Sequence, residues 1–368
     1  MLALRRIALL ILLALACASV SAQQPNAYAV RNLVSDGSVP ADNIDPNLID
    51  GWGVAFNPDG FVWVNSALAG KAVLYDGNGV PNSLVVSVPA ATGGGQGIPT
   101  GIVFSSSADF AVTNGVATGP SRFIFASLTG SISGWAPNVD LTNAIVAVDR
   151  SAQGASYTGL ALAGNGAGHL LYAADVKRGR IDVFDATFTP VTLPGRFRDP
   201  ELPSGFVPFA IHNLQGNLYV SFGKRNADRN FVAPGRGQGI VSVFNANGRF
   251  LRRISSGSSL NAPWGMAIAP ANFGRFSNRL LIGNFGDGTI QAFDVASGRR
   301  VGALRTPQGT RVVIPILWGM AFGNGILTQP TNVLFFAAGP NFGSGGLYGR
   351  ISATTPQPGA LEFAEDEL

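Results

Sequence analysis

A phrase of three short strands that recurs six times is the feature that most limits what this chain can fold into. Each copy has a Gly or Ala, an apolar strand, a second apolar strand, a glycine-containing turn and a third strand that ends near an aromatic residue. The copies start at positions 53, 101, 159, 210, 265 and 319. Weaker fourth strands follow the first five copies, at 84–88, 144–148, 189–193, 250–254 and 300–304. A repeat of roughly 50 residues with four strands is typical of a β-propeller.

The two ends of the repeat array predict how the ring closes. The sixth copy lacks a fourth strand because the chain runs into Thr354, Thr355 and Pro356, whereas a spare apolar strand at 28–34 precedes the first copy. We therefore expect an all-β, six-bladed β-propeller in which residues 28–34 form the outer strand of the last blade. Such closure removes an open sheet edge. The 48 Gly and 23 Pro agree with this fold, because long helices tolerate both residues poorly.

The N-terminus predicts export. Arg5 and Arg6 precede an apolar run at 7–16, and small residues end at Ala22, so residues 1–22 are expected to be a secretory signal peptide. Lipoprotein processing at Cys17 is the alternative, but Ala14 occupies the place where a lipobox has Leu. We expect one propeller domain over 23–355 and an acidic, disordered tail over 356–368. The expected destination is the periplasm or the cell exterior, through the Sec pathway.

Cysteine content and charge exclude several classes of function. The only cysteine, Cys17, lies within the predicted signal peptide, so thiol catalysis and cysteine–zinc sites are excluded. The net charge of +4 includes Arg5 and Arg6, which leave with that peptide. The remaining excess of arginine is sparse, whereas a nucleic-acid interface needs clustered charge. No segment after the first 22 residues is long and apolar enough to span a bilayer. We expect a monomer without a nucleic-acid partner or a membrane span.

Several stretches resemble an uncharacterised family of secreted bacterial propellers, many of which end in a PEP-CTERM sorting tail. The resemblance covers most of the mature chain and is carried by NAPWGMAIAPANFG at 261–274, GNFGDG at 283–288, DPNL at 45–48, LWG at 317–319 and FFAAGPN at 335–341. More distantly, the chain is similar to the NHL and SMP-30-type six-bladed propellers. The resemblance implies the fold and export but no established activity. This chain departs from the family after Pro356, where no PEP motif follows.

Catalytic motifs are missing from the sequence. It contains no G-x-S-x-G elbow, H-E-x-x-H motif or P-loop. The glycine-rich stretch 164–168 precedes a strand rather than a helix, which is the wrong context for a dinucleotide site. His169 and His212 are too few for a multi-histidine metal site, and His212 occupies an inner-strand position that favours a satisfied, buried imidazole. These absences favour a non-enzymatic module.

Four aromatic residues share one repeat position, at the entry to the first strand of a blade. In a propeller the fourth-to-first and second-to-third strand connections lie on one face, around the mouth of the central channel. Trp52, Phe209, Trp264 and Trp318 are therefore predicted to meet there, as a collar that stacks on a sugar or another flat ligand. The alternative is that each ring is a wedge that seals adjacent blades.

Polar residues at the ends of the second strands are expected at the same mouth. They are Asn65, Ser127, Asp175, Ser221 and Asn284. SMP-30-type propellers hold a divalent cation at this place with carboxylates and amides, and a hard cation prefers six or more oxygens. Here only Asp175, helped by Asp50 and Asp287, supplies charge, so we expect no cofactor. The alternative, one calcium or zinc ion at Asp175, stays open beside simple turn capping.

A long loop between the second and third strands of blade four, 223–239, carries four cations. They are Lys224, Arg225, Arg229 and Arg236. Long loops are often functional, and these cations favour contact with an anionic polymer or glycan. A solvated loop without a ligand is the alternative.

The sequence as a whole predicts an exported propeller that binds an extracellular or periplasmic glycan or protein. The alternative is a metal-dependent lactonase or lyase of the SMP-30 type with its site at the channel mouth.

Overall fold

The computed structural model describes residues 26–91 and 95–356. The predicted signal peptide and residues 357–368 of the acidic tail lie outside these ranges, and both stay predictions. Within the described ranges, no helix is long and apolar enough to cross a membrane.

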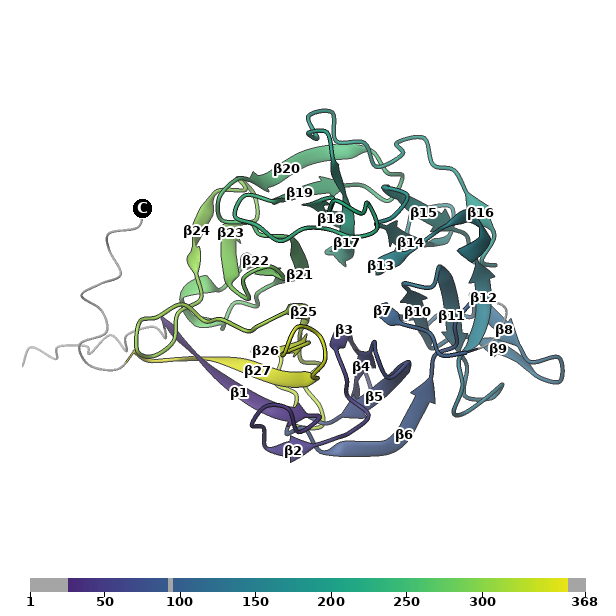
Figure 1. The fold of residues 1–368 in the computed structure, drawn as a ribbon, viewed down its shortest axis with the longest axis horizontal. Helices are drawn as coiled ribbons and strands as arrows, with labels where there is room; N and C mark the ends of the chain where they lie inside the picture. Colours follow the sequence, from purple (N-terminus) through teal and green to yellow (C-terminus); the bar gives the residue numbers. More distant parts are fainter. Residues whose placement is uncertain (1–25, 92–94, 357–368) are drawn as a thin grey trace, which may run out of the picture.

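Six sheets of four or five strands stand around a common axis, which confirms the predicted six-bladed β-propeller (Figure 1). Blade 1 contains β3 (Gly51–Phe56), β4 (Val62–Ser66), β5 (Lys71–Tyr75) and β6 (Pro81–Ser87). Blade 2 contains β7 (Pro99–Phe104), β10 (Phe123–Ser127), β11 (Ser131–Trp135) and β12 (Ile145–Asp149), with the small hairpin β8 (Ala111–Thr113) and β9 (Thr118–Pro120) inserted. Blade 3 contains β13 (Tyr157–Gly164), β14 (His169–Asp175), β15 (Arg180–Phe184) and β16 (Pro190–Val191).

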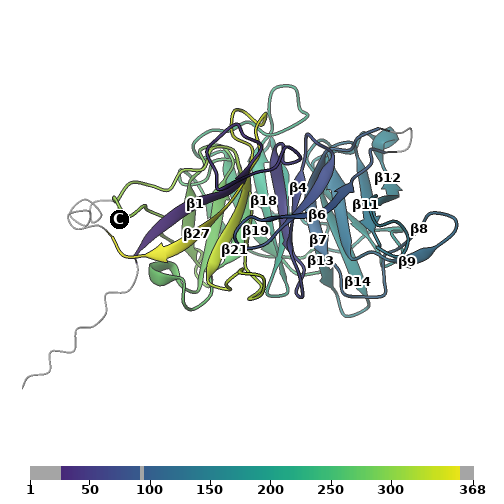
Figure 2. The same cartoon turned by 90° about the horizontal axis from the view of Figure 1, so that it is seen from below.

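The remaining three blades complete the ring. Blade 4 contains β17 (Phe206–Leu214), β18 (Asn217–Lys224), β19 (Gly239–Phe244) and β20 (Phe250–Ser256). Blade 5 contains β21 (Pro263–Ile268), β22 (Arg279–Asn284), β23 (Ile290–Asp294) and β24 (Arg300–Ala303). Blade 6 contains β25 (Leu317–Phe322), β26 (Val333–Ala338), β27 (Leu347–Thr354), β1 (Ala27–Ser35) and the short β2 (Asn43–Ile44). Figure 2 shows the ring from the side as a thick disc whose strands run between two faces. We call the face with the second-to-third strand turns the mouth face.

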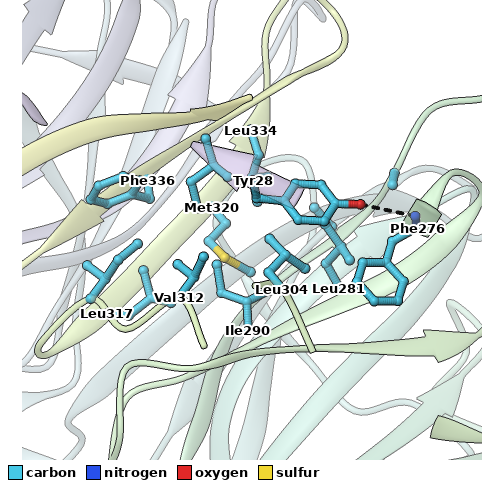
Figure 3. Close-up of a cluster of buried hydrophobic side chains, with 14 of the residues drawn as sticks. Tyr28, Phe276, Leu281, Ile290, Leu304, Val312, Leu317, Met320, Leu334 and Phe336 are labelled. Atoms are coloured by element: carbon cyan, nitrogen blue, oxygen red, sulfur yellow. Dashed lines mark hydrogen bonds between the residues drawn. The ribbon is translucent and has the colours of Figure 1, made fainter. Parts of the chain in front are cut away.

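The N-terminal strand closes the ring in blade 6, as the sequence predicts. β1 pairs antiparallel with β27 from Ala27 opposite Thr354 to Ser35 opposite Leu347. The buried Tyr28 fixes this strand to blade 5, because its hydroxyl donates to the Phe273 carbonyl oxygen (3.0 Å) and accepts from the Phe276 backbone N–H (3.1 Å). Figure 3 shows Tyr28 reaching Phe276 above the apolar side chains between blades 5 and 6. The pairing of β1 with β27 and the apolar cluster between blades 5 and 6 together join the N-terminal and C-terminal ends of the ring.

Glycines at the start of the repeat allow the inner strands to pack backbone against backbone. A Cβ atom added at Gly53 would overlap the Thr100 carbonyl oxygen of blade 2, and one added at Gly319 would overlap the Trp52 carbonyl oxygen of blade 1. Blade 4 has Ala210 at this position, and there the His212 side chain reaches the next blade instead. The recurring glycine therefore marks the axis of the ring.

We expect Gly53→Ala to destabilise the protein by roughly 1–3 kcal/mol, because the new methyl group meets rigid backbone of the next blade. Urea unfolding followed by circular dichroism measures the change. Gly168→Ala is the matched control, since a Cβ atom at Gly168 would have open space around it. Equal stabilities of the two variants would contradict this explanation of the repeat.

The fourth strand of blade 3 is shorter than the sequence suggests. An outer strand is expected over 189–193, but β16 covers only Pro190 and Val191 and pairs only with Val183 and Phe184. Pro190 and Pro194 have no N–H to donate, so this stretch is poorly suited to a longer ladder. The chain instead turns inward and buries Phe197 near Tyr172 and Phe244.

Candidate functional site

A bulge in every inner strand falls at the same repeat position near the mouth face, and in blades 1, 4, 5 and 6 it turns an aromatic ring toward the axis. The pairing register of each first strand shifts at this repeat position. Bulges often redirect a side chain in this way. The six residues at the shifts are Trp52, Thr100, Thr158, Phe209, Trp264 and Trp318. Sequence reasoning identified the four aromatic members and missed the two threonines, whose repeat position was the available signal.

The four aromatic residues of the predicted collar form one cluster. The rings of Trp52 and Trp318 stack with centroids 3.7 Å apart, and Trp264 packs edge-on against both, at 6.4 and 6.1 Å. Phe209 lies 5.9 Å from Trp318. The large rings of blades 1, 4, 5 and 6 thus meet at the axis, whereas the Thr100 hydroxyl of blade 2 donates to the Tyr157 carbonyl oxygen of blade 3.

Two further phenylalanines cover this cluster. Phe231 comes from the long loop of blade 4 and makes edge contacts with Trp52, Phe209 and Trp318 at 5.3–6.4 Å. Phe285, from the turn after β22, stacks on Trp318 at 4.4 Å. The tryptophans are each 3% exposed and Phe209 is fully buried. We call these six rings the aromatic plug. Its members meet at the axis instead of lying singly between blades, and their binding of a ligand stays a prediction.

The three indole N–H groups of the plug differ in their partners. Trp264 Nε1 donates to the Thr158 carbonyl oxygen of blade 3 (2.8 Å), and Trp318 Nε1 donates to Asp50 Oδ1 (3.0 Å). Trp52 Nε1 is buried and has no hydrogen-bond partner among the described residues. Buried donors are nearly always paired, so this N–H marks a place where the plug can still accept a polar partner.

Asp50 lies beside the plug as a buried carboxyl group. It is 7% exposed, and burial raises its pKa to about 7, against the opposing effect of the Trp318 hydrogen bond. Its backbone has a positive φ of 53°, and its N–H donates to the Gly345 carbonyl oxygen. The loop geometry therefore holds a titratable group against an apolar cluster.

Asn65 and Asn284, which the sequence predicts at the mouth, are buried and hydrogen-bonded to neighbouring backbone. Asn65 Nδ2 donates to the Thr100 carbonyl oxygen (2.9 Å), which ties blade 1 to blade 2. Asn284 Oδ1 accepts from the Asn261 N–H (3.0 Å), and its Nδ2 donates to the Ser259 carbonyl oxygen (3.0 Å). Both side chains fasten loops of the mouth face, and their contact with a ligand stays a prediction.

Asp175 is buried among polar groups of blade 3. Its Oδ1 accepts from the Ser156 and Arg178 backbone N–H groups, and its Oδ2 lies 3.5 Å from an Arg178 guanidinium nitrogen. Burial raises the pKa of Asp175 to about 7. No group of three or more His, Cys, Asp or Glu side chains placed to hold a metal occurs among residues 26–91 and 95–356. Calcium or zinc binding at Asp175 stays a prediction.

The two histidines have separate surroundings. His212 Nε2 lies 3.0 Å from the Trp264 carbonyl oxygen, which can only accept, so this nitrogen carries the hydrogen. Burial lowers the pKa of His212 to about 4, so the ring is neutral at pH 7. His169 is exposed and pairs with Asp109 at 2.6 Å. The sequence-based interpretation of His212 as a satisfied inner-strand residue agrees with this bond.

The cationic loop of blade 4 is held at its base and open at its tip. Lys224 Nζ donates to the Ser204 carbonyl oxygen (2.9 Å), and Arg225 donates to the Lys177 carbonyl oxygen (2.9 Å). Arg229 and Arg236 are exposed. The same loop delivers Phe231 to the plug, a role that sequence reasoning missed. A lone aromatic residue within a long polar loop was the available signal.

Comparisons with known proteins place the chain among relatives whose functions are not characterised. It is 32% identical over 333 residues to the uncharacterised protein R648 of Acanthamoeba polyphaga mimivirus, covering 88% of this chain and 80% of R648. It is 31% identical over 301 residues to protein L690 of the same virus, covering 80% and 78%. No protein-family model matches the chain.

Many solved structures are similar in fold. A streptogramin B lyase aligns with a TM-score of 0.51 at 14% identity, over 88% of this chain and 97% of that one. The apo-form soluble aldose sugar dehydrogenase from Escherichia coli gives 0.51 at 14% identity, over 89% and 99%. At such identity the likeness concerns the fold alone. On sequence identity and coverage, the chain belongs to the family of the uncharacterised mimivirus proteins R648 and L690.

Proposed function

We propose that this protein is a non-enzymatic binding module outside the cytoplasm, and that the aromatic plug is its binding site for a sugar ring. The observation that carries the proposal is the buried N–H of Trp52, which lies in a cluster of stacked rings and has no partner within the described part of the chain. Leaving such a donor unpaired costs about 1–3 kcal/mol. A ligand with a flat apolar face and a hydroxyl oxygen offers both a stacking surface and an acceptor.

Phe231 occupies the position that the sugar ring would take. It contacts Trp52, Phe209 and Trp318 through its edge, and it is only partly buried. It reaches the plug from a loop whose tip, 227–230, is exposed. When a sugar ring replaces the Phe231 ring in the plug, most of the apolar surface stays buried. The hydrogen bond from Trp52 Nε1 to the sugar is then the net favourable contribution to the free energy of binding.

The surroundings of the plug favour an anionic glycan. Arg229 and Arg236 are exposed on the loop that carries Phe231, and exposed cations raise the local concentration of anionic ligands. Export to the periplasm or cell exterior, proposed from residues 1–22, would bring the site to such polymers. Membership of the secreted bacterial family belongs to the same proposal.

The experiment is a glycan array, followed by a tryptophan-fluorescence titration with the best-bound oligosaccharide. We expect Trp52→Phe, which keeps an aromatic ring and removes the N–H, to weaken binding about tenfold, the equivalent of about 1.4 kcal/mol. Phe231→Ala should tighten binding, because the competing ring is gone. Trp63→Phe is the matched control, since Trp63 is equally buried but packs between blades 1 and 2.

Two outcomes would overturn the proposal. One is the absence of glycan binding by both the wild type and Phe231→Ala. The other is binding that Trp52→Phe and Trp63→Phe weaken equally, because that result would indicate a general loss of packing rather than loss of a contact.

A further inference from the structure

Blade 3 has an incomplete outer edge on its mouth side. β16 pairs only with Val183 and Phe184, so no strand in the described ranges lies outside Arg180, Ile181 and Asp182. The same positions are paired in other blades: Ile240 and Val241 with Ser256 and Ser255 in blade 4, and Lys71 and Ala72 with Ser87 and Val86 in blade 1. Blade 3 therefore lacks half of a fourth strand.

The free backbone groups of this edge follow from the strand register. The Asp185 N–H donates outward to the Thr189 carbonyl oxygen (2.9 Å). Outward groups recur every second residue in an antiparallel strand, so Val183 and Ile181 also face outward. Val183 lies opposite Val191 of β16, whereas Ile181 faces no strand of the described residues. An unpaired edge of this kind is a template for an added strand.

A cavity of about 1040 Å³ lies along this edge. Its apolar lining includes Ile181, Leu193 and Phe197. The wall is preformed, because Arg196 and Phe197 have positive φ values of 54° and 52°, and the buried Phe197 ring lies 5.4 Å from that of Phe244. Consecutive non-glycine residues in this region are costly, so the surrounding packing holds the cavity open. A strand that pairs with this edge would place apolar side chains in the cavity.

The cavity carries an excess of positive charge. Arg150, Arg196 and Arg198 line it, and none has an ion pair or a side-chain hydrogen bond with a described residue. The two lining carboxylates are already engaged: Asp182 with Arg180 (2.6 Å) and Asp199 with Arg253 (2.7 Å). A strand that carries acidic side chains would supply the missing partners.

We propose that the acidic segment 360–368 of a second copy of this chain adds to the free edge of β15. The segment reads ALEFAEDEL, with four acidic residues and no basic ones. In an extended strand Leu361 and Phe363 share one face with Glu365 and Glu367, and Glu362 and Asp366 lie on the other. Apolar side chains would enter the cavity while carboxylates meet the arginines.

The segment of the same copy is too far away to reach this edge. It follows β27, in blade 6, on the opposite side of the ring from blade 3 (Figure 1). β27 starts at the mouth face, where Leu347 lies opposite Ala338, and runs away from it, whereas the free edge begins at Arg180, next to the mouth-face turn of blade 3. With strands about 4.8 Å apart, crossing the ring takes roughly 35 Å. A six-residue strand over 361–366 leaves residues 355–360 to bridge this distance, and six extended residues reach only about 20 Å.

Charge reversal on the full chain tests this proposal by sedimentation velocity. The site variant combines Arg196→Glu with Arg198→Glu, and the segment variant combines Glu362→Lys with Asp366→Lys. We expect the wild type to self-associate and each variant alone to associate at least tenfold more weakly. An equimolar mixture of the two variants should regain association, because the reversed charges match. Arg229→Glu with Arg236→Glu is the control, with the same charge change on the mouth loop.

Hydrogen exchange locates the contact. Association at this edge should slow exchange of the Ile181 amide, and the segment variant should remove that protection. A wild type that stays monomeric would overturn the proposal. So would association that survives both reversals, or association without protection of Ile181, because the contact would then lie on another surface. Circular dichroism confirms that each variant is folded before it is compared.

Discussion

Replacing Trp318 with alanine is expected to lower the free energy of unfolding by about 3–5 kcal/mol, the usual range for removing a large buried aromatic side chain. Trp318 stacks between Trp52 and Phe285, with centroids 3.7 and 4.4 Å away. The substitution opens a cavity at the axis, where inner strands from all six blades converge. It also leaves the buried Asp50 carboxyl group without its indole donor.

Urea unfolding of the wild type and Trp318→Ala measures this effect. Phe342→Ala is the matched control, because Phe342 is a fully exposed aromatic residue on a mouth-face connection. We expect that control to change stability by no more than about 0.5 kcal/mol. If Trp318→Ala were as stable as the control, the plug would not contribute to folding, and its rings would be held in place for ligand binding alone.

The second large effect is a loss of stability as pH rises, caused by Asp50. Burial raises its pKa from 3.8 to about 7 in the folded protein, so the folded state binds a proton more tightly than the unfolded state does. The resulting stabilisation is fully present below the unfolded pKa and is lost as pH rises through about 7. Between pH 5 and pH 8 the expected loss from this group is about 3 kcal/mol.

Asp50→Asn isolates this contribution. The asparagine oxygen can still accept from Trp318 Nε1, and the side chain stays neutral at every pH. We expect the variant to exceed the wild type in stability at pH 8 by about 3 kcal/mol more than it does at pH 5. The comparison with the wild type is needed because other groups also change stability between pH 5 and pH 8. The raised pKa of Asp175 lowers stability as pH rises, as that of Asp50 does. The lowered pKa of His212, about 4, raises stability as pH rises.

Guanidinium chloride would screen charges, so urea unfolding at the two pH values is the appropriate measurement. A stability difference between Asp50→Asn and wild type that is the same at pH 5 and pH 8 would contradict the raised pKa. Asp175→Asn extends the test, because its carboxyl group is also buried and its pKa is also raised to about 7.

The periodic part of the molecule could be predicted from the sequence. Alternating apolar residues and the glycine before each first strand are local signals, so they indicate six blades, their order and the closing strand. Trp52, Trp264 and Trp318 could be placed at one mouth because they share one repeat position. The same approach failed where local chemistry breaks the repeat, as at Pro190 and Pro194, which leave blade 3 with a two-residue outer strand.

The central site depended on contacts that no local pattern contains. Phe231 reaches the plug from a loop outside the repeat, and Thr158 of blade 3 accepts a hydrogen bond from Trp264, 106 residues later in the chain. Asp50 and Trp318 meet across 268 residues because the ring brings its first and last blades together.

The sequence by itself determined the six-bladed ring, its closure and the aromatic character of its mouth, because strand period and glycine spacing act over short distances. Only the tertiary structure decided that the rings form a closed plug, and that, among residues 26–91 and 95–356, one indole N–H has no partner and the edge of blade 3 lies free beside arginines without ion pairs. These features arise from how the blades pack around the axis, and the burial that packing produces also sets the pKa of Asp50 and the exposure of every candidate residue.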